Sequence, residues 1–395
     1  MPLDDDIQMI SVDDHLVEPP GVWVDRLPAK YHHRCPRVVE VEEDSVEPFY
    51  ATVVHLKKGM QIWRYEDLLE PNVGLTATAG TDLKDRNLDP IRFEQMRRGA
   101  YDPVARLDDM DIDGVWAQAP FPSFPGFGGN KFVFATDKEL ARLCVGAYND
   151  FLLDEWCAAA PDRYIPLIIL PLWDAAACVA EIERCAAKGA RGITFPDNPA
   201  GLGLPSFQSD GWDGVFSAAE DAGMPLCMHF GSSKIVPYVS AEAPQAVVTT
   251  LFGITLFNSM AELVLSPVFH RHPRLAVAYA EGGIGWFPYA IQRLDQVWET
   301  YRELPLENNI DPDARPSDLV REHVWACFID DPVGVRDRHD IGVDRILWES
   351  DYPHSDSLWP GSRAHAAKVF ADVPSDEVRK IVEDNARSLF RFEGR

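Results

Sequence analysis

The sequence predicts an α/β protein with a TIM-type (β/α)8 barrel, in one domain that spans residues 1–395. Short apolar runs alternate with helical patterns almost to the end of the chain, and eight of these runs have the length and composition of strands. Several runs are apolar at every position, as expected of parallel strands that are covered on both faces. Eight repeats of strand and helix favour a parallel barrel over an open sheet.

The predicted strands are rich in Val, Ile, Leu, Phe and Ala. They cover residues 7–12, 114–119, 164–172, 192–195, 224–230, 275–280, 324–329 and 345–348. The clearest helices between them cover residues 137–160, 175–188 and 211–222, which end before Pro161, Gly189 and Gly223. A last helix over residues 375–390 would close the fold, with Ser375 as its N-cap.

One long segment, from about residue 39 to 102, does not fit the repeat and separates the first strand from the second. It holds Trp63, Tyr65 and the glycine-containing stretch 73–81. We interpret it as an insertion that packs over the barrel mouth, because loops after barrel strands commonly shape the substrate pocket. The alternative is a peripheral subdomain with no part in the chemistry.

Composition and charge restrict the partners. Hydrophobic residues make up 46% of the chain, and 63 acidic against 37 basic residues give a net charge of −26. A field of that sign repels phosphate backbones and anionic lipid, so we expect a small-molecule substrate and neither nucleic acid nor a membrane as partner. The seven cysteines form no CxxC pair, and the N-terminus lacks an apolar signal core, so we expect the cytoplasm. The aromatic content suggests a homo-oligomer, for example a dimer.

Ionisable residues follow or end several predicted strands. Asp13 and His15 are two residues apart after the first strand, so both side chains can face the same side. A carboxylate and an imidazole presented together suit Zn, Mn or Fe. His229 ends the fifth strand, and Asp351 follows the eighth, where Pro353 halts it.

Taken singly, each of these residues has a plainer explanation. Asp13 or Asp351 could stabilise a turn, and His229 could be a hydrogen-bonded core histidine. Together, however, they supply oxygen and nitrogen ligands from the first, fifth and eighth strands, whose carboxyl ends converge on one face of a barrel. The sequence therefore predicts a metal site of Asp13, His15, His229 and Asp351.

Four segments, 11–23, 225–233, 269–295 and 346–356, resemble the amidohydrolase superfamily. Within it they are most similar to the branch of aminocarboxymuconate-semialdehyde decarboxylase and resorcylate decarboxylase. The resemblance extends over the whole barrel, and it implies the same four metal ligands. Many members begin with His-x-His, whereas this chain has Asp13 in the first position. Some decarboxylases of the branch carry a carboxylate there, often with Mn or Zn, so the resemblance still implies a metal site but makes zinc less certain.

A second departure from that family lies after the sixth strand. The decarboxylases carry a catalytic histidine there, whereas this chain has Glu281 in the sequence AYAEGGIG. A glutamate can act as a base, as a second-metal ligand, or as an acid if burial raises its pKa. It could also form a salt bridge with Arg293. The change lowers the expectation of simple decarboxylation.

Other polar residues near the predicted site leave a second ion open. Asp197 follows the fourth strand and His354 lies three residues beyond Asp351, and either could join Glu281 in binding that ion. His354 could equally be an unligated acid or base. We expect one divalent ion per chain, with two as the alternative. His270 and His272 have metal-like spacing but precede the sixth strand, which places them on the opposite face.

The sequence thus predicts metal-assisted hydrolysis of a small organic carbonyl compound, with an aromatic compound among the options, by a metal-activated water. The predicted catalytic residues are Asp351, Glu281 and His354, with Asp351 orienting the water or taking its proton. Non-oxidative decarboxylation is the first alternative. A dinuclear iron or manganese thioesterase or oxygenase is the second, and a non-catalytic metal-binding partner subunit is the third.

Overall fold

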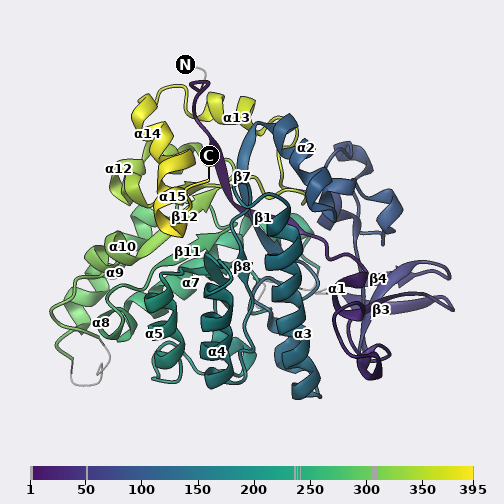
Figure 1. Ribbon diagram of the computed structural model, residues 1–395. Coiled ribbons are helices and arrows are strands. Elements are labelled where there is room, and N and C mark those ends of the chain that lie inside the picture. Colours follow the sequence, from purple (N-terminus) through teal and green to yellow (C-terminus); the bar gives the residue numbers. More distant parts are fainter. Residues whose placement is uncertain are drawn as a thin grey trace.

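Eight parallel strands form the centre of the protein in the computed structural model, which describes residues 3–49, 52–234, 237, 239–240, 242–304 and 310–394 (Figure 1). All eight predicted strands are present. They are β1 (Met9–Leu16), β7 (Val115–Pro122), β8 (Leu167–Ile168), β9 (Gly192–Thr194), β10 (Leu226–His229), β11 (Val277–Ala280), β12 (Val324–Phe328) and β13 (Ile346–Trp348). β1 pairs with β7, and the other six form one sheet in the order β13-β12-β11-β10-β9-β8.

Backbone hydrogen bonds connect the β1–β7 pair to both edges of the six-stranded sheet. On one side, Gln118 of β7 bridges to Tyr164 just before β8, and its carbonyl accepts from the Ile165 N–H at 2.8 Å. On the other side, the Asp351 N–H donates to the Asp13 carbonyl at 2.9 Å, beyond the end of β13. The carboxyl ends of β1 and β13 therefore lie side by side.

Strand ends differ from the prediction in two informative places. β1 continues through Asp13 and His15 to Leu16, so both polar residues belong to the strand itself. β8 covers only two of the nine residues predicted. Pro166 and Pro171 flank it, and proline has no N–H to donate to a ladder.

Helices follow most strands and pack around the sheet (Figure 1). The longer ones are α2 (Pro103–Asp113), α3 (Lys138–Phe151), α4 (Ala175–Ala186), α5 (Asp213–Ala222), α7 (Phe252–Val264), α9 (Phe287–Tyr301), α10 (Pro316–His323) and α13 (Ser362–Val369). Asp137 and Asp174 cap α3 and α4 by accepting backbone N–H groups of the first turn. α5 ends at Gly223, whose φ of 62° is a left-handed conformation that glycine adopts without strain.

The C-terminal helix is present, but its start differs from the prediction. It consists of α14 (Ser375–Arg379), a π-helical turn (Lys380–Asp384) and α15 (Asn385–Phe390). The prediction that Ser375 is the N-cap is wrong, because Ser375 is the first helical residue and Pro374 occupies the cap position. Its hydroxyl donates instead to the Asp4 carboxylate at the other end of the chain.

The segment between β1 and β7 forms small antiparallel sheets. β2 (Arg37–Glu40), β5 (Gln61–Tyr65) and β6 (Leu68–Pro71) make one sheet, and β3 (Ser45–Phe49) and β4 (Thr52–Leu56) make a hairpin. The hairpin projects from the side of the molecule near the short helix α1 (Gly21–Val24), as Figure 1 shows. Residues 50 and 51 of the predicted insertion lie outside the described part.

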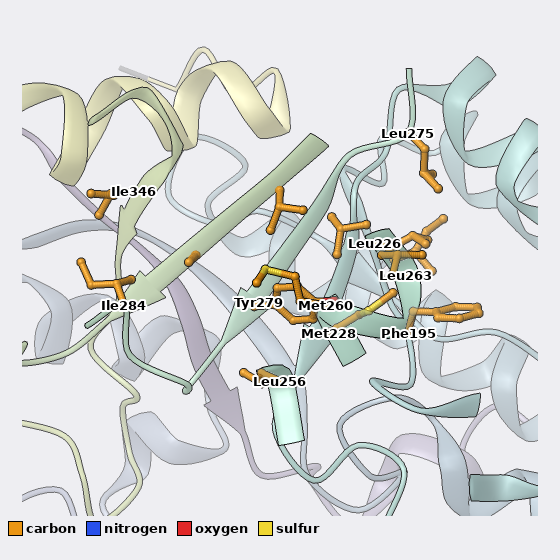
Figure 2. Close-up of a cluster of buried hydrophobic side chains, with 14 of the residues drawn as sticks. Phe195, Leu226, Met228, Leu256, Met260, Leu263, Leu275, Tyr279, Ile284 and Ile346 are labelled. Atoms are coloured by element: carbon orange, nitrogen blue, oxygen red, sulfur yellow. The ribbon is translucent and has the colours of Figure 1, made fainter. Parts of the chain in front are cut away.

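Both faces of the central strands are buried, which explains their continuous apolar sequence. Along β10 and β11, Cys227 and Ala278 belong to one cluster, together with side chains of β1, β7, β12 and β13. Their neighbours Leu226, Met228 and Tyr279 belong to a second cluster that includes residues of α7 (Figure 2). Within the described residues, no helix combines the length and apolar character needed to cross a bilayer.

Candidate metal centre

Four predicted ligands converge at the carboxyl ends of three strands. Asp13 and His15 come from β1, His229 is the last residue of β10, and Asp351 follows β13. The His15 Nε2 atom lies 3.6 Å from Asp13 Oδ1 and 3.2 Å from Asp351 Oδ1. The His229 Nε2 atom lies 3.5 Å from Asp13 Oδ2. All four side chains are fully buried.

The ring of His229 is oriented by its other nitrogen. Nδ1 lies 2.6 Å from the carbonyl oxygen of Phe230, so the N–H on this nitrogen donates to that carbonyl. The proton-free Nε2 then faces the carboxylates of Asp13 and Glu281. A backbone carbonyl that fixes the histidine tautomer is the usual support of a metal-binding imidazole.

Several buried polar atoms at this place have no hydrogen-bond partner among the described residues. They are both carboxylate oxygens of Asp13 and Asp351, both ring nitrogens of His15, and Nε2 of His229 and His354. Buried polar atoms are otherwise almost always paired. Ligand atoms of Asp13, His15 and His229 lie within 4.8 Å of one another. A divalent cation would satisfy this set, and mixed carboxylate and imidazole donors suit Mn, Fe or Zn.

Burial shifts the proton affinities of the same groups. It raises the pKa of Asp13 and Asp351, and neighbouring carboxyl groups, including Glu281, raise both further. It lowers the pKa of His15, with a smaller contribution from His354. His15 is therefore held neutral, as a metal-binding histidine must be. A nearby positive charge would favour the ionised form of both carboxyl groups.

His354 and Glu281 lie on either side of this group. The Nδ1 atom of His354 is 3.0 Å from Asp351 Oδ1, and its ring stacks on His15 at 3.6 Å between centroids. Burial lowers the pKa of His354 to about 3, so the ring is neutral. Glu281 Oε2 lies 3.0 Å from His229 Nε2, so it faces the metal centre.

Asp197, the other residue predicted to bind a second ion, has different contacts. Its Oδ1 accepts hydrogen bonds from the Ser232 hydroxyl at 3.0 Å and from the Ser233 N–H at 2.9 Å. The carboxylate therefore holds the loop that follows His229. Among the described residues, ligand atoms converge in two groups, one of Asp13, His15 and His229 and one of His15, Asp351 and His354, and Asp197 belongs to neither.

Two residues beside the centre were not singled out from the sequence. Glu349 is buried and accepts from the Glu281 N–H at 3.2 Å, and burial raises its pKa to about 7. Its alternation with Asp351 along the strand was the available signal. The ring of Phe127 lies 4.0 Å from the ring of His229 and 4.8 Å from that of His15. It comes from the glycine-rich loop 126–129.

Side chains beneath the centre fix the ends of its strands. Arg106 of α2 is fully buried and donates to the carbonyl of His15 at 2.6 Å and to Gln118 of β7 at 2.9 Å. Asp14, which points away from the metal side, accepts the N–H of Tyr352 at 2.9 Å. β1 is therefore tied to both of its neighbours where it carries Asp13 and His15.

The polar residues that were expected to be structural have structural contacts. His272 pairs with Asp213 at 3.3 Å, and His270 is exposed, both away from the metal centre. Asp331 caps α11 (Pro332–Arg336) by accepting the Gly334 N–H at 2.8 Å.

Two cavities flank the centre. One has a volume of about 420 Å³ and reaches His354. Its wall comprises Trp63, Leu68, Leu69, Glu70, Pro71, Asn72, Thr76, Ser123, Phe124, Gly126, Phe127, Asn130, Lys131, Gly231 and Lys234. The other has a volume of about 520 Å³ and is lined by acidic groups that include Glu281 and Glu349.

Comparisons with a family profile and with known proteins point to the same family. The amidohydrolase sequence profile matches residues 32–392. The chain is 23% identical over 309 residues to 2-amino-3-carboxymuconate-6-semialdehyde decarboxylase of Dictyostelium discoideum, covering 72% of this chain and 76% of the relative. It is 26% identical over 270 residues to gamma-resorcylate decarboxylase of Rhizobium radiobacter, covering 62% and 76%. The resemblance drawn from the sequence is confirmed.

Solved structures share the fold. An amidohydrolase of Mycobacterium avium subsp. paratuberculosis has a TM-score of 0.74 at 22% identity, covering 98% of this chain and 99% of its own. A 5-carboxyvanillate decarboxylase of Novosphingobium aromaticivorans has a TM-score of 0.65 at 17% identity, covering 98% and 97%. The latter was crystallised with manganese and 4-hydroxy-3-methoxy-5-nitrobenzoic acid.

Proposed function

Because the chain belongs to the amidohydrolase family, we propose that it is a metal-dependent, non-oxidative decarboxylase of a small aromatic acid. The observation that carries this proposal is the buried group of unpaired ligand atoms from Asp13, His15, His229 and Asp351. Both curated relatives described above are decarboxylases. They favour carbon–carbon bond cleavage over the hydrolysis expected from the sequence.

In this proposal Asp13, His15, His229 and Asp351 hold one divalent ion. When bound, the ion supplies a positive charge that attracts carboxylate or phenolate oxygens and draws electron density from the ring. Manganese is the first candidate, since the carboxyvanillate decarboxylase was crystallised with it. A second ion beside Glu281 and His354 remains the alternative.

Asp351 is the proposed proton donor. Burial, together with the charges of Glu281 and Asp13, raises the pKa of its carboxyl group, and a carboxyl group that binds a cation through one oxygen has a second oxygen that can carry a proton. The proton adds to the ring carbon that bears the carboxylate. The bond to the carboxylate carbon then breaks, its electron pair restores the aromatic ring, and CO2 leaves. Water then returns a proton to Asp351. His354 can relay this proton, because its Nδ1 atom lies 3.0 Å from Asp351 Oδ1.

The remaining side chains position the reactants and exclude water. Phe127 and Phe121 pack against the rings of His15 and His229, so one side of the centre has an apolar wall. Glu281 keeps His229 in place through its 3.0 Å contact. Electrostatic interactions are stronger in such a site than in water.

We also propose that the eight strands close into the (β/α)8 barrel. One apolar cluster contains inward-facing residues of seven strands, which supports closure. Its described members on strands are Ile10, Val12, Ala117, Ala119, Phe121, Leu167, Cys227, Ala278, Ala280, Cys327 and Leu347. The segment 39–102 would then cover part of the mouth, since Trp63 and Glu70 line the cavity that reaches His354.

The reaction can be tested directly. Manganese-loaded protein is incubated with hydroxylated benzoic acids in D2O, and released CO2 and the ring product are measured. We expect one CO2 per product and a single deuterium at the vacated ring carbon. Asp351→Asn should abolish both signals. Product formed without CO2, with oxygen from labelled water incorporated, would reject decarboxylation.

Hydrolysis is the second candidate because of one observation. This chain has Glu281 at the position where the decarboxylases that it resembles carry a histidine. A carboxylate 3.0 Å from His229 is better suited to accept a proton from water than to donate one. Elemental analysis also separates the alternatives, because two ions per chain would favour the dinuclear reactions. One ion per chain would count against them.

A further inference from the structure

The two cavities beside the metal centre carry opposite charge. The cavity that reaches His354 is lined by two lysines, Lys131 and Lys234, and by one carboxylate, Glu70. Its charged lining residues therefore sum to one positive charge, in a chain of net charge −26. The other cavity is lined by four carboxyl groups and, among its described residues, by no lysine or arginine. These are Glu281, Asp330, Glu349 and Asp356.

We propose that Lys131 and Lys234 bind an anionic group of the substrate remote from the metal, so that the preferred substrate is an aromatic dicarboxylate. This inference rests on the proposed decarboxylase function. One carboxylate would lie at the metal centre, and the second would lie between the two ammonium groups. Trp63, Phe124 and Phe127 give the same cavity aromatic walls for the ring.

The two lysines belong to loops that the structure holds together. Lys131 follows β7 and Lys234 follows β10, the strand that ends at His229. Asn130, beside Lys131, donates from its side chain to the carbonyl of Ser232 at 2.6 Å, and both of these residues are buried. This buried contact holds the two segments that carry the lysines, while the side chain of Lys234 itself is exposed and that of Lys131 is half-buried.

The charges in the cavity are only partly balanced. Lys131 forms an ion pair with Glu70 and lies 5.0 Å from the centre of the Phe124 ring. Lys234 lies over the ring of Phe134 at 4.3 Å. Burial, and then the charge of Lys131, lowers the pKa of Lys234. A bound carboxylate, in addition to that of Glu70, would offset the repulsion between the two lysines.

The backbone of Lys234 gives independent support. Its φ of 61° is in the left-handed region, which costs a non-glycine residue free energy. Such strain persists where the surrounding structure imposes it, and it is concentrated at ligand-binding sites. Lys234 is one of the residues that line the cavity.

Binding measurements test the inference without requiring turnover. Dissociation constants of benzene-1,3-dicarboxylate and benzoate are measured by calorimetry on the full-length, manganese-loaded protein. We expect at least tenfold tighter binding of the dicarboxylate, because a charge-assisted hydrogen bond contributes about that factor or more. Lys234→Met should reduce the preference about tenfold, whereas the matched variant Lys234→Arg should keep it.

Glu70→Gln provides a change of opposite sign. It removes the carboxylate that competes for Lys131, so the dicarboxylate should bind more tightly while benzoate is unaffected. A misfolded variant would not bind more tightly. The inference is overturned if the wild type binds both acids equally, binds neither, or keeps its preference in Lys234→Met. If the wild type prefers the dicarboxylate but releases CO2 from no aromatic acid, the proposed reaction is rejected and the anion site is retained.

Discussion

At the scale of single residues, burial couples the ionisable groups of the metal centre to one another. His229 contributes a nitrogen whose direction is fixed by the Phe230 carbonyl, while Asp13 and Asp351 contribute carboxylates whose pKa burial raises. Each group is unfavourable alone in a buried site. Together with a cation they become mutually stabilising.

Replacing His229 by alanine should remove the metal and the activity together. The imidazole supplies a predicted ligand atom, Nε2, which lies 3.5 Å from the carboxylate of Asp13. Metal content is measured by elemental analysis after gel filtration. The matched control is His270→Ala, because His270 is exposed on the opposite face. A His229→Ala protein with full metal content would exclude this ligand assignment.

Glu18 should give the metal-free protein a measurable pH dependence. Burial outweighs the N–H groups donated by Ser123 and Phe124 and raises the pKa of this carboxyl to about 7. The folded state therefore holds a proton that the unfolded chain loses near pH 4.5. Stability from this group is complete below pH 4.5 and falls by at most about 1.4 kcal/mol per pH unit up to pH 7.

The Glu18→Gln variant isolates that contribution, because its amide does not titrate. Urea unfolding of both metal-free proteins is measured at pH 5, 6 and 7. From pH 5 to pH 7 the free energy of unfolding of the wild type should fall steadily relative to that of the variant. A constant difference would show that Glu18 does not titrate there.

At the scale of elements, helix α2 supports the metal centre from below. Its N-cap Asp102 accepts the N–H groups of Val104 and Ala105 at 2.9 and 3.1 Å. One turn later the same helix places Arg106 against the carbonyl of His15. Local capping and the placement of β1 are therefore linked through a single helix.

Asp102→Ala should lower the free energy of unfolding by about 1 kcal/mol, because two backbone N–H groups lose their acceptor. Chemical denaturation provides the measurement. Asp108→Ala, at an exposed position of the same helix, is the matched control and should change stability by no more than about 0.5 kcal/mol. Equal effects of the two variants would show that the cap contributes no specific stability.

At the scale of the whole molecule, the two ends of the chain meet. Asp4 accepts from Arg363 and Ser375, and the side chain of Arg387 donates to Gln8 at 2.5 Å. The first and last strands are likewise joined through Asp13 and Asp351. A metal bound across this junction should therefore stabilise the entire fold.

Manganese should raise the thermal stability of the metal-free protein. At a free concentration one hundred times the dissociation constant, binding to the folded state adds about 2.7 kcal/mol. Calorimetric unfolding with and without the ion measures the effect, and His229→Ala should show little of it. An equal rise in wild type and variant would place the ion elsewhere.

Much of the architecture followed from local pattern. All eight strands were predicted, because doubly buried parallel strands require continuous apolar runs. Helix ends at Gly223 and caps such as Asp137 follow from local backbone chemistry. Ser375 was mispredicted because the helix begins one residue earlier than its capping chemistry suggested, and the hydroxyl found a partner 371 residues away.

The sequence by itself determined the strand and helix pattern and the identity of Asp13, His15, His229 and Asp351 as a candidate set, because residue type and spacing are local properties. Only the tertiary structure decided which other groups join them. Glu281 and His354 lie against the ligands, Asp197 turns to a serine loop, and Phe127 and Glu349 complete the surroundings. Those outcomes depend on distances between segments far apart in the chain, which packing sets and spacing along the sequence does not.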